Sequence, residues 1–244
     1  MKSDFHNKVT DSFSHLEDKS VFTVDSSKVA CLDLEGTLVE GSVWRVLNRA
    51  FGVKESIADE LLEMFLNGLI SYDQWADTLV ETWKLPSGEQ PTKNNIEKLT
   101  KNFEVLDGAY ELVEILNDKG YFTVSISGAP DIFSREVAHE LGIDRDIPTQ
   151  RLVFDNNNML RKVLVLNDYD FSKDHIIRKL KSNNQLQEVL AVGDGLNDVD
   201  MCREADFGCI VIRRGRKDRV DYKRLKSDGV LVDTLQNISQ KIKI

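Results

Sequence analysis

The chain contains no long hydrophobic run. Although 41% of its 244 residues are hydrophobic, no apolar stretch approaches the roughly 20 residues that a membrane-spanning helix needs. The first segment, Met1–Ser20, alternates charged and polar side chains and has no apolar block of the kind found in a secretory signal. We therefore expect a soluble globular protein of the cytoplasm that has no membrane partner.

Cysteine is scarce, and its spacing does not suggest metal binding. The three cysteines, Cys31, Cys202 and Cys209, form an odd set without a CxxC pair. We interpret them as buried or partly buried free thiols in a reducing compartment. A zinc site built from all three is the less favoured alternative.

An excess of positive charge is also absent. The chain has 32 Lys and Arg against 41 Asp and Glu, which gives a net charge of −9. Because duplex affinity depends largely on neutralised phosphates, this balance disfavours nucleic acid as a partner. One local exception is the basic segment Arg213–Lys226. It is either a solvated loop followed by a surface helix, or a docking patch for an anionic partner.

The pattern of apolar residues divides the chain into three kinds of segment. Residues 1–27 are a polar extension, in which 21–24 predict a short strand. Residues 42–102 place apolar residues at helical spacing and lack strand signals, so we expect an all-helical insertion there. Residues 28–41 and 103–244 form the remaining core. A chain of 244 residues is long enough for a core domain with a smaller inserted domain.

Within the core, predicted strands alternate with predicted helices. A hairpin is expected where an Asn-rich turn separates 151–154 from 162–166. The alternation elsewhere predicts an α/β fold with a parallel sheet and right-handed crossovers. In such sheets the ligand lies beyond the carboxyl ends of the strands. The remaining strands are expected at 28–33, 121–126, 189–192, 207–212 and 230–232, and the helices at 109–119, 130–141, 172–181 and 197–204.

The first predicted strand ends in Asp33-Leu-Glu-Gly-Thr37. Asp33 is an anion at neutral pH and can attack phosphorus to form an aspartyl-phosphate. Glu35 can protonate the leaving oxygen and later accept a proton from water. Thr37 can hold the loop or bind the phosphate. The alternatives are an ordinary turn aspartate and a solvent-facing Glu35 beside Glu40.

Two further sequence motifs contain groups that can bind phosphate. Ser127-Gly128 follows a predicted strand and precedes a helix opened by Pro130, so a hydroxyl and free N–H groups can form an anion cradle. Lys173 begins another predicted helix and can bridge Asp33 and a phosphate. Taken alone, Ser-Gly is also a routine turn pair, and most lysines at helix starts are simply solvated.

The strongest single motif is Gly193-Asp194-Gly195-Leu-Asn197-Asp198. Asp194 ends a Val-rich strand, and Asp198 lies one helical turn further on the same side. Together with Asp33, these carboxylates supply the oxygen ligands that Mg²⁺ prefers. A phosphoryl-transfer enzyme is therefore predicted by four motifs, which begin at Asp33, Ser127, Lys173 and Gly193.

These motifs resemble the four motifs of the haloacid dehalogenase superfamily over residues 28–212. The helical insertion resembles the cap of the phosphoserine-phosphatase-like branch. The resemblance implies a Rossmann-like three-layer core with a parallel sheet, a small all-helical cap domain and a small phosphorylated metabolite as substrate. It also implies Asp33 as nucleophile, Glu35 as acid/base, phosphate contacts by Thr37, Ser127, Gly128, Lys173 and Asn197, and Mg²⁺ binding by Asp33, Glu35 (through its backbone carbonyl), Asp194 and Asp198.

Two departures from the family pattern bear on the substrate. Most family phosphatases have Asp at position 35, whereas the Asp-x-Glu form resembles a phosphotransferase branch. Phosphoserine phosphatases also bind the substrate carboxylate through an arginine of the cap, but the corresponding predicted helix, Ser71–Trp83, contains none. Arg45 and Arg49 are candidate substitutes, and Glu40 is a candidate partner for a substrate amine.

Four aromatic residues of the insertion, Trp44, Tyr72, Trp75 and Trp83, are interpreted as cap core rather than pocket wall. The leading hypothesis is a Mg²⁺-dependent hydrolase of a small phosphomonoester, acting as a monomer or homodimer. The alternatives are transfer to an alcohol acceptor, phosphoserine hydrolysis specifically, and a non-catalytic binding role. Dehalogenation is disfavoured because it needs no Mg²⁺ and leaves Asp194 and Asp198 unexplained.

Overall fold

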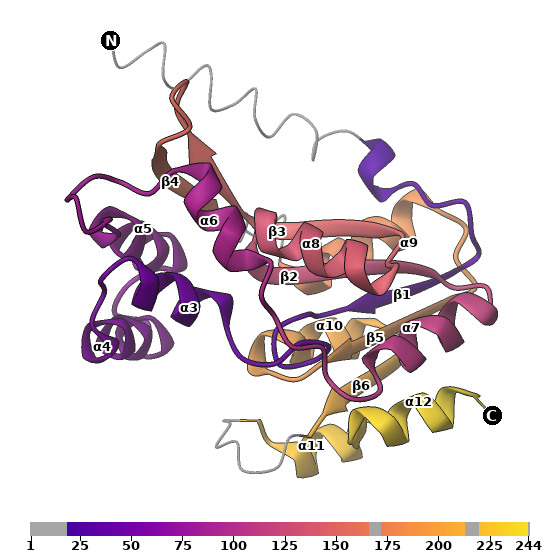
Figure 1. Cartoon of the computed structure of the whole chain (residues 1–244). Coiled ribbons are helices and arrows are strands. Elements are labelled where there is room, and N and C mark those ends of the chain that lie inside the picture. The colour runs from indigo at the N-terminus through magenta and orange to yellow at the C-terminus, as the bar shows by residue number, and fades with distance from the viewer. Residues whose placement is uncertain (1–18, 166–171, 213–219, 244) are drawn as a thin grey trace.

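A mostly parallel sheet of seven strands forms the centre of the protein (Figure 1). The computed structural model describes residues 19–165, 172–212 and 220–243. The strand order is β4-β3-β2-β1-β5-β6-β7, and only the pairing of β3 with β4 is antiparallel among the described strands. The strands are β1 (Lys28–Leu32), β2 (Phe122–Pro130), β3 (Arg145–Phe154), β4 (Leu160–Val165), β5 (Glu188–Gly193), β6 (Phe207–Val211) and β7 (Leu231–Asp233).

Strand β1 lies at the point where the strand order reverses. It pairs in parallel with β2 on one side and β5 on the other. Side chains of Val29 to Leu32 are all fully buried, as expected for a central parallel strand covered on both faces. The carboxyl ends of three neighbouring strands consequently meet at one edge of the sheet, where ligands bind in open α/β folds.

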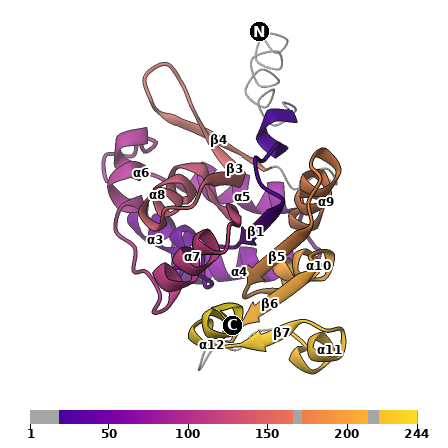
Figure 2. The same cartoon turned by 90° about the vertical axis from the view of Figure 1, so that its right-hand side faces the viewer.

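Helices cover both faces of the sheet and give three layers (Figure 2). Residues of β1 alternate between two hydrophobic clusters, with Ala30 and Leu32 in one and Val29 and Cys31 in the other. The first cluster also contains side chains of α7 (Ala109–Asp118), α8 (Asp131–Leu141) and α12 (Leu235–Lys243). The second contains side chains of α9 (Lys173–Asn183), α10 (Val199–Glu204) and α11 (Tyr222–Ser227). The predicted three-layer α/β class is confirmed.

Four helices lie between β1 and α7 in the sequence: α3 (Val43–Ala50), α4 (Glu55–Leu66), α5 (Tyr72–Thr82) and α6 (Lys93–Thr100). The indole rings of Trp44, Trp75 and Trp83 hold α3 and α5 together, with ring centroids 5.0 and 5.6 Å from Trp44. Helix α5 packs against β4, and α6 packs against α8. In the part of the chain that the structure describes, no helix combines the length and apolar character needed to cross a membrane.

The structure corrects the prediction for the start of the chain. Residues Lys19–Phe22 form a 3₁₀ turn rather than a strand. The guanidinium of Arg145 donates to the carbonyls of Val21 and Thr23 at 2.8 and 2.7 Å, so these carbonyls are not free for strand pairing. Phe22 is also buried against the core, so the end of the segment 1–27 is more than a polar extension. Residues 1–18 lie outside the described residues.

Two strands are longer than predicted. Strand β2 continues to Pro130, and β3 begins at Arg145, because Ser127 and Pro130 pair with Pro148 and Gln150 across an irregularity. Pro130 is therefore the N-cap residue of α8, which begins one residue later than predicted. The predicted helix 197–204 begins with the 3₁₀ turn η2 (Leu196–Asp198). Of the basic segment, 213–219 lie outside the described residues, and the surface helix α11 follows.

Candidate active site

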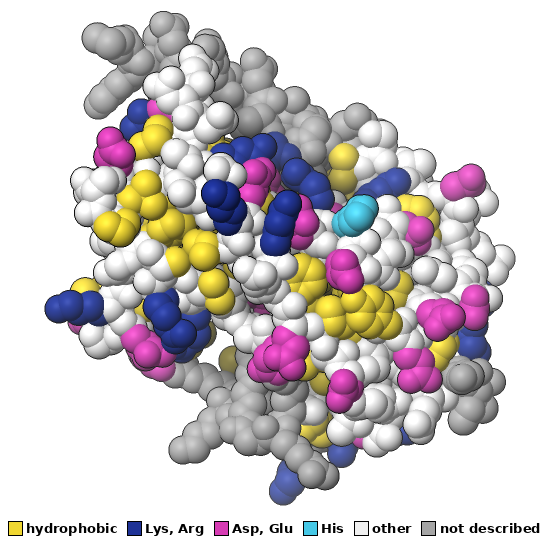
Figure 3. Space-filling model, viewed as in Figure 1, with side chains coloured by type: hydrophobic (Ala, Val, Ile, Leu, Met, Phe, Trp, Pro, Cys, Tyr) yellow, Lys and Arg dark blue, Asp and Glu magenta, His cyan; other side chains and the backbone are white. Residues whose placement is uncertain are grey.

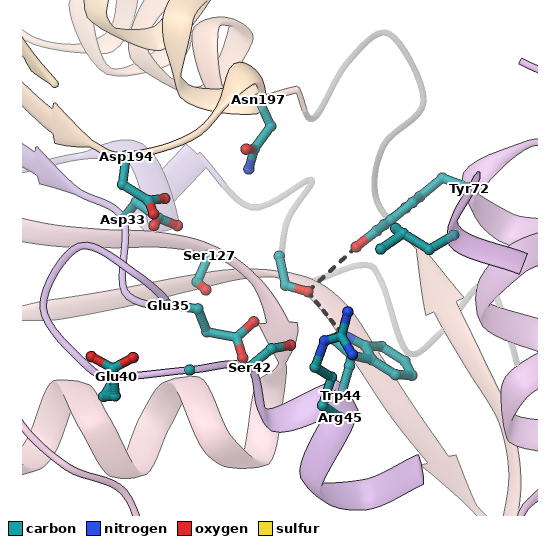
Figure 4. Close-up of a pocket in the computed structure, with 13 residues that line it drawn as sticks. Asp33, Glu35, Glu40, Ser42, Trp44, Arg45, Tyr72, Ser127, Asp194 and Asn197 are labelled. Atoms are coloured by element: carbon teal, nitrogen blue, oxygen red, sulfur yellow. Dashed lines mark hydrogen bonds between the residues drawn. The ribbon is translucent and has the colours of Figure 1, made fainter. Parts of the chain in front are cut away.

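The four predicted motifs converge at the carboxyl edge of the sheet, and Figure 4 shows residues of three of them. Asp33 directly follows β1, and its backbone N–H donates to the carbonyl of Val192 on β5 at 2.9 Å. Ser127 lies in β2, and Asp194 follows β5. Lys173 begins α9. Parallel pairing of three neighbouring strands thus brings together residues that are up to 161 positions apart.

Lys173 forms a buried ion-pair network with two carboxylates. Its Nζ lies 2.6 Å from Asp33 Oδ1 and 2.6 Å from Asp198 Oδ1. Burial alone would lower the pKa of Lys173, but the two carboxylates outweigh it and raise this pKa. The ammonium therefore remains charged and holds both carboxylates. The predicted bridge from Lys173 to Asp33 is present, and a contact with Asp198 accompanies it.

Thr37 holds the candidate nucleophile. Its Oγ1 donates to Asp33 Oδ2 at 2.8 Å, and its side chain is completely buried. Burial raises the pKa of Asp33 to about 6, with Asp198 adding to the rise and Lys173 opposing it. Asp33 is thus an anion at neutral pH, with both carboxylate oxygens fixed by hydrogen bonds. Thr37 thus contacts Asp33, and its predicted contact with phosphate stays a prediction.

Three buried aspartates form a cluster suited to a cation. Ligand atoms of Asp33, Asp194 and Asp198 all lie within 4.8 Å of one another. Asp198 Oδ2 also accepts the backbone N–H groups of Asp194 and Gly195 at 3.1 and 3.0 Å. Among the described residues Lys173 pairs with two of these three carboxylates, and a hard divalent cation suits such a set of oxygen ligands. The Glu35 carboxylate is not part of this cluster.

Gly193 lets Asp198 approach the end of β5. A Cβ atom at this position would lie 2.3 Å from Asp198 Cβ and 2.5 Å from its Cγ. We expect Gly193→Ala to displace the carboxylate, lower stability by about 1–3 kcal/mol and reduce activity about 100-fold. Steady-state kinetics at several metal concentrations would measure the change.

Gly208→Ala is the matched control for Gly193→Ala. Its Cβ would meet the backbone oxygen of Cys202 at 2.1 Å, and Cys202 is not one of the three clustered aspartates. Both variants should lose stability, but only Gly193→Ala should need more metal for half-maximal activity. An equal metal requirement in the two variants would mean that Gly193 does not position Asp198.

Glu35 is held at the start of α3. Its Oε1 accepts the backbone N–H of Val43, and its side chain faces the pocket. Burial raises the pKa of Glu35 to about 7, an effect that the Val43 hydrogen bond opposes. A carboxyl group that titrates near neutral pH can both donate and accept a proton, which is what general acid–base catalysis requires.

A cavity of about 660 Å³ opens above these carboxylates. Arg49 is exposed and does not line it, whereas Thr37, Lys173 and Asp198 lie buried behind its wall. Eight predicted residues do line it, namely Asp33, Glu35, Glu40, Arg45, Ser127, Gly128, Asp194 and Asn197. Residues that the sequence did not assign to the site also line it, namely Gly41, Ser42, Trp44, Leu62 and Tyr72.

Trp44 and Tyr72 line the pocket and also pack in or against the hydrophobic core, so the prediction of core rather than pocket wall is only half right. Trp44 Nε1 donates to the carbonyl of Gly128 at 3.2 Å, and the Tyr72 hydroxyl lies 3.5 Å from the same oxygen (Figure 4). Gln150 donates its amide to the Tyr72 hydroxyl. A buried Trp or Tyr usually pairs its polar atom, but this tendency does not identify pocket residues, because Trp83 Nε1 pairs with Asn48 inside the core at 2.7 Å. Trp75 and Trp83 are buried as predicted.

The motif pattern and this geometry agree with a comparison against family models. The haloacid dehalogenase-like hydrolase model matches residues 27–206. The chain belongs to this family. The match begins just before β1 and ends just before β6, so it includes all four motifs.

Several similar curated proteins and solved structures are named phosphoserine phosphatases. Phosphoserine phosphatase of Methanocaldococcus jannaschii is 26% identical over 183 residues, which cover 73% of this chain and 82% of the relative. The phosphoserine phosphatase of Lactococcus lactis subsp. lactis is 30% identical over 179 residues, covering 72% and 80%. A solved phospho-aspartyl intermediate analogue of phosphoserine phosphatase has a TM-score of 0.70 at 22% identity, covering 90% of this chain and 100% of that one. At this identity the structural likeness shows the fold.

Proposed function

We propose that the protein is a Mg²⁺-dependent phosphatase that hydrolyses a small phosphomonoester through an aspartyl-phosphate on Asp33. One observation carries this proposal: Asp33, Asp194 and Asp198 form a buried cluster with Lys173 against it, and Asp33 and Asp194 of this cluster line the cavity. The names of the similar proteins support phosphatase chemistry. The three free, buried cysteines agree with the cytoplasmic location that we propose.

The first chemical step uses Asp33 and Glu35. A carboxylate oxygen of Asp33 forms a bond to phosphorus while the bond from phosphorus to the ester oxygen breaks. Glu35 gives its proton to the departing oxygen, which leaves as an alcohol. In the second step water attacks phosphorus, the bond to Asp33 breaks, and Glu35 takes the proton from water.

The other residues of the site bind the phosphate and neutralise its charge. Asp33, the Glu35 carbonyl, Asp194 and Asp198 would hold Mg²⁺, which when bound would supply positive charge that lets two anions meet. Ser127 and Gly128 supply a hydroxyl and backbone N–H groups to the phosphate oxygens, and Asn197 contributes its amide. Lys173 damps repulsion between Asp33 and the phosphate.

Residues 42–102 form the proposed cap over the core of residues 28–41 and 103–244. Trp44 on α3 and Tyr72 on α5 both reach the carbonyl of Gly128, beside the phosphate cradle. The cavity is bounded on this side by Arg45 and Leu62. This placement supports a role for the insertion in selecting the alcohol part of the substrate.

Metal removal tests the proposal directly. Purified protein with Mg²⁺ is expected to release phosphate from p-nitrophenyl phosphate, and EDTA should stop the release. Adding excess Mg²⁺ back should restore it, which controls for damage by the chelator. Release that EDTA leaves unchanged would contradict the role assigned to the aspartate cluster.

A further inference from the structure

Two side chains of the helical insertion converge on the carbonyl oxygen of Gly128. Strand β2 has two residues, Gly128 and Ala129, where the neighbouring strand β3 has only Thr149, so the regular pairing is interrupted here. Such a bulge disturbs the backbone ladder and redirects side chains. Trp44 Nε1 on α3 and the Tyr72 hydroxyl on α5 lie 3.2 and 3.5 Å from the Gly128 oxygen (Figure 4). The insertion therefore contacts the backbone at the bulge itself.

Tyr72 is fixed by both packing and hydrogen bonding. Its ring stacks on that of Trp75, with centroids 5.1 Å apart, and packs against Phe65 at 5.0 Å. Gln150 donates its side-chain amide to the Tyr72 hydroxyl. Burial raises the pKa of Tyr72, so the hydroxyl keeps the proton that it donates to Gly128. Hydrophobic side chains also gather on the surface over α5 (Figure 3), and because apolar packing is non-directional, the hydrogen bonds set the direction of this contact.

The Gly128 carbonyl is connected to the hydroxyl of Ser127 through one peptide unit. Because that unit is planar, the carbonyl of Gly128 and the N–H of Ala129 turn together and point in opposite directions. This N–H donates to Ser127 Oγ at 3.1 Å. The preceding carbonyl, that of Ser127, is already held by Thr149 Oγ1 at 3.0 Å. The orientation of the Gly128 peptide unit thus decides where the Ser127 hydroxyl points, and Ser127 lines the cavity.

We propose that Tyr72, together with Trp44, is a positioning residue that aims the Ser127 hydroxyl at the phosphate. The contacts run from Tyr72 to the Gly128 carbonyl, across the peptide unit to the Ala129 N–H, and from there to Ser127. The inference rests on the proposed phosphatase function and adds residues of the insertion to its phosphate site. The insertion then has a part in phosphate binding as well as in selecting the alcohol.

Tyr72→Phe removes the hydroxyl and keeps the ring. We expect kcat/KM to fall about tenfold, and by the same factor for p-nitrophenyl phosphate and ethyl phosphate, because the two esters share only the phosphate. Inorganic phosphate should also inhibit the variant less strongly. Tyr110→Phe is the matched control, because the half-exposed Tyr110 donates its hydroxyl to Glu140 at 2.7 Å and does not line the cavity. It should keep wild-type kinetics.

A double-mutant cycle tests whether Tyr72 acts through Ser127. Ser127→Ala alone should lower kcat/KM about 100-fold. In the Ser127→Ala background, Tyr72→Phe should cost less than about twofold, because the group that it positions is gone. Gln150→Met, which removes the amide that binds the Tyr72 hydroxyl, should follow the same pattern with a smaller loss. Circular dichroism and thermal unfolding would confirm that each variant is folded.

The outcomes separate this inference from the function on which it rests. If folded Tyr72→Phe keeps wild-type kinetics, or loses as much with Ser127 as without it, the positioning role is overturned and the phosphatase function stands. A loss confined to one of the two esters likewise overturns it, because Tyr72 would then contact the alcohol part. No phosphate release by the wild type from either ester overturns the phosphatase function and this inference with it.

Discussion

Replacing Asp33 by Asn is expected to lower phosphate release by a factor on the order of 10⁴ or more. The amide has nearly the same shape but lacks the anionic oxygen that attacks phosphorus. Asp33 lies between Lys173 and Thr37, at 2.6 and 2.8 Å, so its position is set by the surrounding structure. The variant should therefore fold and bind phosphate esters while failing to turn them over.

Asp107→Asn is a suitable control for this variant. Asp107 is exposed and lies away from the pocket lining, so the same chemical change there should leave activity at the wild-type level. Circular dichroism and thermal unfolding would show whether Asp33→Asn keeps the fold. Activity close to wild type in a folded Asp33→Asn protein would remove Asp33 from the role of nucleophile.

Replacing Lys173 by Met is expected to lower the free energy of unfolding by about 3–5 kcal/mol, because it leaves buried carboxylates without their cation. The Lys173 side chain is only 7% exposed, and those of Asp33 and Asp198 are 6% and 0% exposed. Burial and the neighbouring Asp198 already raise the pKa of Asp33 in the folded state, and loss of the opposing ammonium raises this pKa further. Raised carboxyl pKa values cost stability as pH rises, so the difference from wild type should grow between pH 5 and pH 8.

Metal addition separates this explanation from a simple packing defect. A divalent cation neutralises the same carboxylates and should restore part of the stability of Lys173→Met by binding the folded state. Lys223→Met, at an exposed position of α11, should behave like wild type. Urea unfolding could instead show the same loss of unfolding free energy at pH 5 and pH 8, and no effect of metal. In that case the ion pairs of Lys173 do not explain the lost stability.

The location of the site followed from local patterns in the sequence. Asp33 and Asp194 each end a short apolar run, and Ser127 and Lys173 stand at predicted strand-to-helix or helix boundaries. Parallel strands separated by helices must align their carboxyl ends, so the sequence order alone places these four residues together. The structure brings them to one edge for that reason.

Contacts between distant segments could not be predicted in this way. Arg45 and Arg49 lie one turn apart on α3, and periodicity does not say that Arg45 lines the pocket and pairs with α4. Likewise, Trp44 reaches Gly128, 84 residues away, through its indole N–H. Such choices depend on how α3 packs against the sheet, for which a single sequence carries no periodic signal.

The most direct test of the account is to trap the covalent intermediate. Wild type and Glu35→Gln would be mixed with p-nitrophenyl phosphate and Mg²⁺, quenched within milliseconds in acid, and digested for mass spectrometry. The nitrophenolate group departs without an acid, so Glu35→Gln slows the second step alone. The account predicts phosphate on the peptide that contains Asp33, with more of it in Glu35→Gln because loss of the base slows attack by water. Phosphate on another residue, or substrate turnover without any phosphorylated peptide in either protein, would contradict it.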